Sequence, residues 1–129
     1  MKGYVTNIEK KTIKNKFFRE VLFTSKNLQL VVMTLKPSED IGLEIHPKVD
    51  QFFRIEKGKG KVVMEGESQR VEAGDVFIVP QGTHHNVINT SKTKSLKLYT
   101  LYSPPNHRDG VVHKTKQEAE SDKTDIPGK

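Results

Sequence analysis

The stretch GDVFIVPQGTHHNVIN, residues 74–89, carries the most informative pattern in this chain of 129 residues. Its opening glycine and aspartate suit a tight turn, and the segment PQG at 80–82 suits a second turn. The segments VFIVP and HHNVIN are rich in β-branched residues, which favours two short strands. Because neighbouring side chains in a strand point to opposite faces, only one of His84 and His85 can face the interior.

The rest of the central region has the same character. Short segments rich in β-branched and apolar residues alternate with turn segments such as KPSED, GKG and EGES, without a convincing helical stripe between them. Even strand spacing without crossover helices predicts an all-β fold, either an antiparallel sandwich or a barrel. The expected strands lie at 19–24, 28–37, 41–46, 51–58, 61–66, 68–75, 76–80, 84–89 and 96–102.

The segment GLEIH, residues 42–46, alternates apolar and polar side chains. Leu43 and Ile45 share one face of the expected strand, and Glu44 and His46 share the other. One interpretation places Glu44 and His46 in water, and the other turns them inward, where both can reach one bound group. The segment taken alone does not decide between these interpretations.

Composition narrows the classes of protein and partner. The chain has no cysteine, which excludes disulfides, thiolate metal sites and a cysteine nucleophile, and which is compatible with a cytoplasmic protein. The net charge is +6, but the lysines are dispersed and aromatic residues make up 7%, so we expect no nucleic-acid partner. No apolar run reaches membrane-spanning length and no apolar leader begins the chain, so we expect neither a membrane span nor a secretory signal.

The 74–89 stretch resembles the second motif of the cupin superfamily. That motif is a glycine, five residues, Pro-x-Gly, two residues, a histidine, three residues and an asparagine. The resemblance selects His85 over His84, and stretches such as GLEIHP and DQFFRIEKG resemble small single-domain bacterial-type cupins described as mannose-6-phosphate-isomerase-like. The matching positions are Gly74, Pro80, Gly82, His85 and Asn89.

The first cupin motif is matched in spacing but not in every residue type. Ser38 stands at the position of the first glycine, and Glu44 stands at that of the first histidine. His46 is the second histidine, Gln51 replaces the usual glutamate, and Gly58 closes the motif as expected. These exchanges put the chemistry of cupins with three histidines and one glutamate in doubt for this chain.

The resemblance implies a double-stranded β-helix, or jelly-roll barrel, over residues 19–104. Residues 1–18 would form an N-terminal arm, and residues 105–129 would form a C-terminal segment. Helix formers at 115–123 predict one short helix within that segment, and the tail at 124–129 is expected to be frayed.

The resemblance also implies one divalent transition metal near the mouth of the barrel, held by Glu44, His46, Gln51 and His85. Two imidazoles and a carboxylate suit Zn, Mn, Fe, Ni or Co, and the sequence leaves the metal's identity open. It also leaves open whether Glu44 is a ligand or an acid or base beside a metal with three ligands.

Further side chains are candidates for catalysis. Tyr99 and Lys97 share one face of the last long strand, where they would supply a proton donor and a cation; the alternative is packing for Tyr99 and solvent for Lys97. His113 is a third candidate, because its segment, NHRDGVVH, can fold over the barrel mouth. We expect His107, in the same segment, to lie at the surface.

These patterns favour a metal-dependent enzyme of the isomerase or lyase type, acting on a small sugar-like or hydroxy-carbonyl substrate whose carbonyl the metal polarises. A sugar phosphate would require a cationic cluster, with candidates Lys48, Lys97 and Arg108. The alternatives are a non-haem iron dioxygenase and a non-enzymatic metal-binding, ligand-binding or sensor module. If Glu44 and His46 face inward, Leu43 and Ile45 face outward and need cover, which predicts a homodimer.

Overall fold

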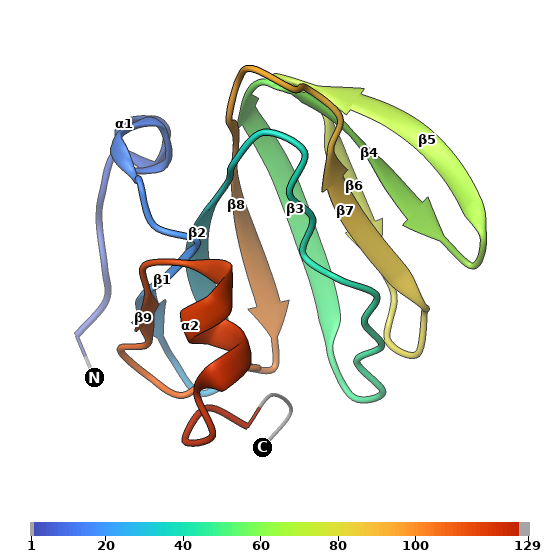
Figure 1. The fold of residues 1–129 in the computed structure, drawn as a ribbon. Coiled ribbons are helices and arrows are strands. Elements are labelled where there is room, and N and C mark those ends of the chain that lie inside the picture. The colour runs from blue at the N-terminus through green and yellow to red at the C-terminus, as the bar shows by residue number, and fades with distance from the viewer. Residues whose placement is uncertain (1, 127–129) are drawn as a thin grey trace.

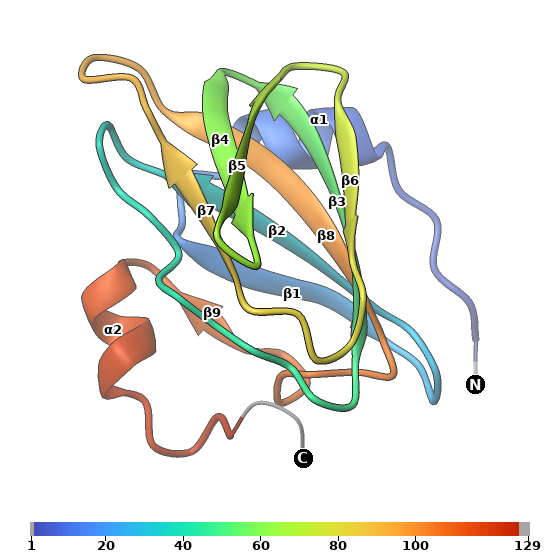
Figure 2. The ribbon, with the colours of Figure 1, turned by 90° about the vertical axis from the view of Figure 1, so that its right-hand side faces the viewer.

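Two antiparallel β-sheets face each other in the computed structural model, which describes residues 2–126 (Figures 1 and 2). The six-stranded sheet has the order β6-β3-β8-β2-β1-β9, and the three-stranded sheet has the order β5-β4-β7. This confirms the expected all-β jelly-roll architecture. The strands are β1 (Arg19–Thr24), β2 (Gln29–Leu35), β3 (Asp50–Lys57), β4 (Lys59–Met64), β5 (Glu67–Glu72), β6 (Val76–Val79), β7 (His85–Asn89), β8 (Leu96–Ser103) and β9 (Val112–His113).

The core lies between the two sheets, and both contribute to it. Along β8 the buried and partly exposed residues alternate, as expected for a strand with one face in a core. Gln51, Phe53 and Ile55 of β3 are buried on one face, and Val62 of β4 and Val87 of β7 are buried in the opposite sheet. Phe53, Ile55 and Val87 therefore contribute to an apolar wall on the inner faces of the two sheets.

The expected strand at 41–46 is not present. Instead, two isolated bridges, Asp40–Ile88 and Glu44–His85, and a hydrogen bond from the Gly42 amide to Asn86 Oδ1 join the connecting segment between β2 and β3 to β7, which it follows in both views (Figures 1 and 2). Ser38, which replaces the glycine of the first motif, has φ +64°. A left-handed residue and widely spaced bridges make this segment a loop that is hydrogen-bonded to β7 without forming a strand.

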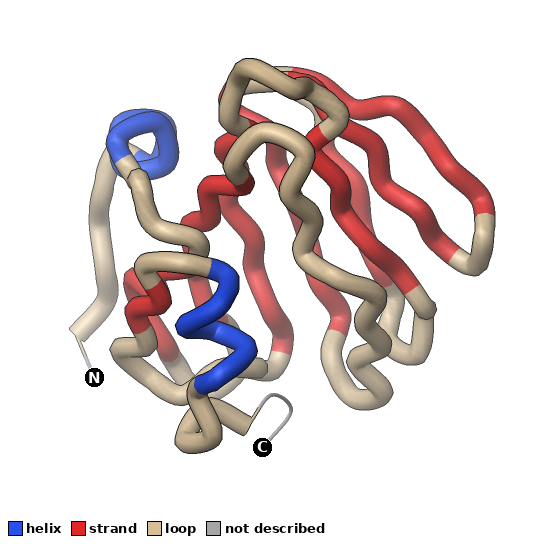
Figure 3. Tube along the Cα trace, in the orientation of Figure 1, coloured by secondary structure: helices blue, strands red, loops and turns tan. Residues whose placement is uncertain are grey.

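Both ends of the chain contain short helices (Figure 3). In the N-terminal arm, the unpredicted helix α1 (Ile8–Lys14) begins at Asn7, whose side chain accepts a hydrogen bond from the Lys10 amide. The predicted C-terminal helix is confirmed as α2 (Lys116–Ser121). Among the described residues, neither helix is long and apolar enough to cross a membrane.

The expectation of a frayed tail at 124–129 is wrong for the part that the structure describes. Asp125 is buried and its carboxylate contacts the imidazole of His107, which anchors the chain up to that point. Residues 127–129 lie outside the described range. A buried hydrogen bond between His107 and the Asp125 carboxylate holds this segment against the barrel, and composition alone did not reveal it.

Candidate metal centre

The backbone brings the two motifs together at the start of β7. The Glu44 amide donates to the His85 carbonyl at 2.8 Å, and the His85 amide donates to the Glu44 carbonyl at 2.9 Å. The Gly82 amide donates to the His46 carbonyl at 2.8 Å. The first motif is therefore fixed by main-chain hydrogen bonds to the turn and strand of the second motif.

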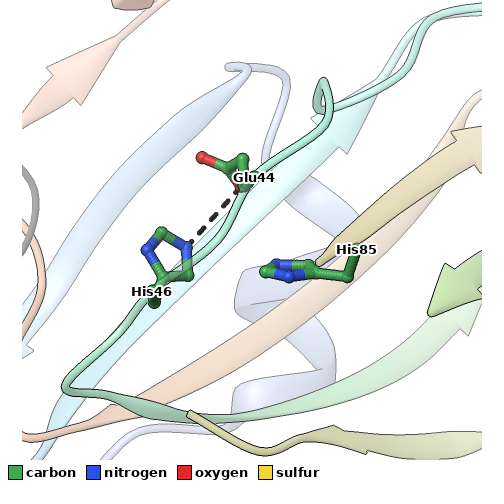
Figure 4. Close-up of side chains that lie close together, drawn as sticks. All are labelled: Glu44, His46 and His85. Atoms are coloured by element: carbon green, nitrogen blue, oxygen red, sulfur yellow. Dashed lines mark ion pairs between the residues drawn. The ribbon is translucent and has the colours of Figure 1, made fainter. Parts of the chain in front are cut away.

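Three side chains converge from this backbone arrangement (Figure 4). Ligand-type atoms of Glu44, His46 and His85 all lie within 4.8 Å of one another. The Nε2 atom of His46 lies 3.8 Å from Oε1 of Glu44, and the two imidazole centroids are 5.4 Å apart. Glu44 and His46 therefore face inward. Leu43 and Ile45 are 74% and 45% exposed, so the outward direction predicted for them is also confirmed.

The hydrogen bonds of His85 prepare it to be a metal ligand. Its Nδ1 lies 2.9 Å from the Thr83 carbonyl oxygen, which can only accept, so Nδ1 carries the proton. Burial lowers the pKa of His85, which favours the neutral imidazole. The lone pair is then on Nε2, and a ligating histidine typically has this arrangement, with its other nitrogen bound to a carbonyl.

The buried Nε2 atom of each imidazole in the cluster is without a hydrogen bond to any described residue. Within residues 2–126, Nε2 of His46 and Nε2 of His85 have no hydrogen-bond partner. Leaving buried polar atoms unsatisfied costs about 1–3 kcal/mol each. Burial alone would raise the pKa of Glu44, but His46, Arg19 and His85 outweigh it and lower the pKa, so the carboxylate is ionised. Two imidazole lone pairs and a carboxylate fit a divalent metal ion.

Gln51 lies on the same inner face. It is opposite Tyr102 in the β3–β8 register, and the Tyr102 ring centroid is 6.0 Å from that of His46. The Gln51 amide donates through Nε2 to Thr100 at 3.0 Å, while the buried Oε1 has no hydrogen-bond partner in the described chain. This orientation leaves an amide oxygen available as a weaker ligand.

Tyr99 and Lys97 do not lie beside the cluster. The inward residues of β8 are Leu98, Thr100 and Tyr102, so alternation puts Tyr99 and Lys97 on the outer face. Lys97 donates through Nζ to the carbonyl of Asn15, just after α1. Tyr99 lies 6.3 Å from Phe52, centroid to centroid. The prediction that Tyr99 and Lys97 act at the site is therefore wrong, because both side chains lie on the outer face of β8.

His107 is buried, in contrast to the expected surface position. Its Nδ1 lies 2.8 Å from the Asp125 carboxylate, and its Nε2 lies 3.2 Å from the Tyr102 hydroxyl. An ionised carboxylate only accepts, so Nδ1 donates to Asp125 and Nε2 accepts from Tyr102. Burial raises the pKa of Tyr102, which keeps the phenol protonated. Sequence reasoning missed this hydrogen-bonded series of side chains, Tyr102, His107 and Asp125, because Asp125 lies in the tail that was expected to be frayed.

Two cavities adjoin the cluster. One of about 420 Å³ is lined by Glu44, His46, Lys48 and Asn106, among others. A second of about 280 Å³ is lined by Glu44, His107 and Asp125 together with residues of α2. Glu44 is common to both, so a small molecule in either cavity can contact the candidate metal-binding cluster.

Comparison with known proteins agrees with this architecture. The cupin domain family matches residues 31–102, and the chain belongs to this family. It is 50% identical over 125 residues to the uncharacterized protein YrkC of Bacillus subtilis, covering 92% of this chain and 66% of YrkC, so the chain spans about two thirds of that relative. It is 45% identical over 113 residues to an uncharacterized protein of Acanthamoeba polyphaga mimivirus, covering 84% of this chain and 70% of the viral protein.

Solved structures show the same fold. A crystal structure of a Bacillus halodurans protein superposes with a TM-score of 0.91 at 42% identity, covering 94% of this chain and 96% of that one. The structure of KdgF from a Halomonas species gives a TM-score of 0.63 at 25% identity, covering 70% and 79%. A predicted oxalate decarboxylase of Thermotoga maritima gives 0.58 at 25% identity, covering 61% and 68%.

Proposed function

We propose that this cupin is a metal-dependent enzyme that isomerises or cleaves a small, oxygen-rich hydroxy-carbonyl compound. The observation that carries the proposal is the convergence of Glu44, His46 and His85 with buried nitrogen atoms that lack protein partners. When bound there, a divalent metal supplies a Lewis acid that polarises a carbonyl oxygen. Gln51 supports the donor set through its free amide oxygen.

The buried, hydrogen-bonded side chains of Tyr102, His107 and Asp125 are the best candidates for moving a proton at this site. Tyr102 lies between His46 and His107, with its ring centroid 6.0 Å from the first and 5.2 Å from the second. His107 accepts from the phenol, and Asp125 fixes the imidazole through its other nitrogen. A base that is oriented by a carboxylate is a common arrangement in proton transfer. We propose these three side chains as the acid–base group in place of Tyr99, Lys97 and His113.

The arrangement of cations argues against a sugar-phosphate substrate. Of the three candidates, Lys48 lines the cavity beside His46, whereas Lys97 lies on the outer face. Arg108 is half-exposed and paired with Asp122 at 3.5 Å. We therefore propose a substrate without a phosphate group. The resemblance to mannose-6-phosphate-isomerase-like cupins then does not extend to the substrate.

A non-haem iron dioxygenase is the second candidate. Two histidines and one carboxylate with open positions are the ligand set of such oxygenases, and Glu44, His46 and His85 supply those ligand types. A third candidate, a non-enzymatic binding module, would present no access for substrate beside the metal. The two cavities at Glu44 favour an enzyme over such a module.

The first experiment is elemental analysis of protein purified without added metal. We expect about one equivalent of a transition metal, and less than about a tenth of an equivalent, with none bound on addition, would overturn the site. The loaded protein is then incubated with dihydroxyacetone or glyceraldehyde in D₂O. Exchange of the α-proton, followed by NMR, supports the isomerase-type chemistry. Bound iron with oxygen uptake and no exchange supports the dioxygenase instead.

A further inference from the structure

Arg19 is a buried cation that lacks a carboxylate partner. It is the first residue of β1, points into the molecule and is 6% exposed. Its guanidinium lies 5.2 Å from the centroid of the Phe18 ring. Within residues 2–126, its Nε has no hydrogen-bond partner, and no carboxylate oxygen lies within 4.0 Å of its nitrogens. Burying a charge in this way is costly unless a bound anion compensates it.

The side chain of Arg19 lines the cavity of about 280 Å³ that also contains Glu44 and His107. Glu44 belongs to the proposed metal centre, so one small molecule in this cavity can touch both the metal ligands and the guanidinium. Glu44 is an ionised carboxylate that the Arg19 charge helps to stabilise, while other charged groups around the cavity are already paired or exposed. Asp125 pairs with His107 at 2.8 Å, and Lys116 pairs with Asp40. Glu120 is exposed.

The neighbouring strand holds Arg19 in position. Arg19 is paired with His113 in the β1–β9 register, and its Nη1 lies 3.3 Å from His113 Nδ1. The Asp122 carboxylate lies 2.9 Å from His113 Nε2 and must accept from it. The lone pair of His113 is therefore on Nδ1, where it accepts a hydrogen bond from Arg19. This leaves Nε–H as a buried donor without a hydrogen-bond partner among the described residues, on a residue that lines the cavity, and it makes His113 a positioning residue.

We propose that Arg19 binds the carboxylate of the substrate, so that this enzyme acts on a small hydroxy or keto acid. The inference rests on the proposed function and specifies its substrate class. A guanidinium edge matches the two oxygens of a carboxylate. A phosphate dianion is disfavoured, because the carboxylates of Glu44, Asp122 and Asp125 line the same small cavity.

The test uses glycolate and its neutral analogue glycolamide as probes, with binding to zinc-loaded protein measured by calorimetry. Arg19→Gln is expected to weaken glycolate binding by about tenfold or more, since a hydrogen bond to a charged group is lost, while glycolamide binding and zinc content stay unchanged. Arg19→Lys keeps the positive charge but loses the paired N–H donors of the guanidinium, and it should recover part of the glycolate affinity. Arg70→Gln, on β5, is the matched control and should bind as the wild type does. Equal glycolate binding by wild type and Arg19→Gln, at equal zinc content, would overturn the inference.

A second measurement does not depend on the folding of a variant or on metal. The side-chain Nε–H resonance of Arg19 is followed by NMR while glycolate is added to the metal-free wild-type protein. A saturable shift with glycolate and a smaller one with glycolamide support the inference, and an unchanged resonance contradicts it. Failure to take up any metal overturns the proposed function alone, because this titration still reports on Arg19. Competition by inorganic phosphate at equal concentration would contradict the choice of a carboxylate.

Discussion

Glu44 and His85 are joined through their backbones by a reciprocal pair of hydrogen bonds of 2.8 and 2.9 Å, although Glu44 does not belong to any strand. This bridge gives the loop before β3 a fixed register against β7. Residues opposite each other in such a bridge project to the same side, so the carboxylate and the imidazole meet. Two segments about forty residues apart thereby form one site.

Removing a proposed ligand should lower metal affinity without unfolding the protein. We expect Glu44→Ala and His85→Ala each to reduce metal affinity by about tenfold to a hundredfold or more, because each removes a lone-pair donor from the cluster. Elemental analysis after dialysis against a weak chelator measures the loss. Leu43→Ala is the matched control, since this neighbour points outward and is 74% exposed. Full occupancy in Glu44→Ala would indicate that Glu44 is an acid or base rather than a ligand.

The pair of Asp125 and His107 should stabilise the fold. Asp125→Asn keeps the shape of the side chain but removes the charge that accepts from His107 at 2.8 Å and from the Arg108 amide at 2.7 Å. We expect a decrease of about 1–3 kcal/mol in the free energy of unfolding, measured by urea denaturation. Asp109→Asn, at an exposed position in the same segment, is the control and should change stability little. A wild-type stability for Asp125→Asn would mean that the tail is not docked.

The free energy of unfolding of the metal-free protein should decrease as the pH is lowered through the range where histidine titrates. Burial lowers the pKa of His107 and of His85 from the ordinary value of 6.5. A group with a lowered folded pKa contributes stability that is complete above the unfolded pKa and is lost as the pH falls through the folded pKa. The free energy of unfolding should therefore decrease as the pH falls below about 6.5.

Urea denaturation in the presence of a chelator, repeated across this pH range, measures the effect. His84→Gln is the matched control, because His84 is exposed and its removal should leave the pH profile unchanged. Asp125, whose pKa is also lowered, should keep its contribution until the pH falls below the ordinary aspartate value of 3.8. A flat profile between about pH 7 and 5 would contradict the assignment of neutral buried histidines.

Two glycines of the cupin motifs offer a paired test of close packing. Gly58 and Gly74 have nearly equal φ angles, +98° and +96°, so alanine is strained at both. A Cβ on Gly58 would lie 2.6 Å from the Ser95 carbonyl oxygen, whereas one on Gly74 would meet nothing within 4 Å. We expect Gly74→Ala to cost about 1–2 kcal/mol from backbone strain and Gly58→Ala to cost a further ~1–3 kcal/mol from overpacking. Equal losses in chemical denaturation would contradict the close approach at Gly58.

The homodimer remains a prediction. Leu43 and Ile45 form an exposed apolar pair on the loop beside β7, and a second copy of the chain is the cover that we propose. Light scattering after size exclusion should give the mass of a dimer at micromolar concentration, and Leu43→Ser should shift it toward the monomer. Glu39→Ser, at a polar position in the same loop, is the control. A monomeric wild-type protein under these conditions would refute the prediction.

Much of the site could be predicted from local pattern. The resemblance of 74–89 to the second cupin motif selected His85 over His84, and the structure agrees, since His85 is buried at the proposed metal centre while His84 is exposed. Alternation across residues 43–46 correctly put Leu43 and Ile45 on one side and Glu44 and His46 on the other, although no strand forms there and only the cupin resemblance indicated which side is inward. Side-chain direction follows from local backbone geometry, which a short stretch of sequence largely specifies.

Other assignments depended on which face of an element meets the core. Tyr99 and Lys97 do share one face of β8, as predicted, but it is the outer face. Alternation identifies residues on one side of a strand without saying which side is inside. The choice is made when the whole of β8 packs, because burying Leu96, Leu98 and Tyr102 removes far more apolar surface from water than burying Lys97 would allow.

The sequence by itself determined the strand-rich fold, the cupin motifs and the types of ligand at the proposed metal centre, because these depend on residue type and short spacing. Only the tertiary structure decided that Arg19 faces the same cavity as Glu44, and that His107 is paired with Asp125. Those residues are far apart along the chain, and β9 and the tail bring them together. Contacts of this kind are set by long-range packing and by the need to pair buried charges, which no local pattern encodes.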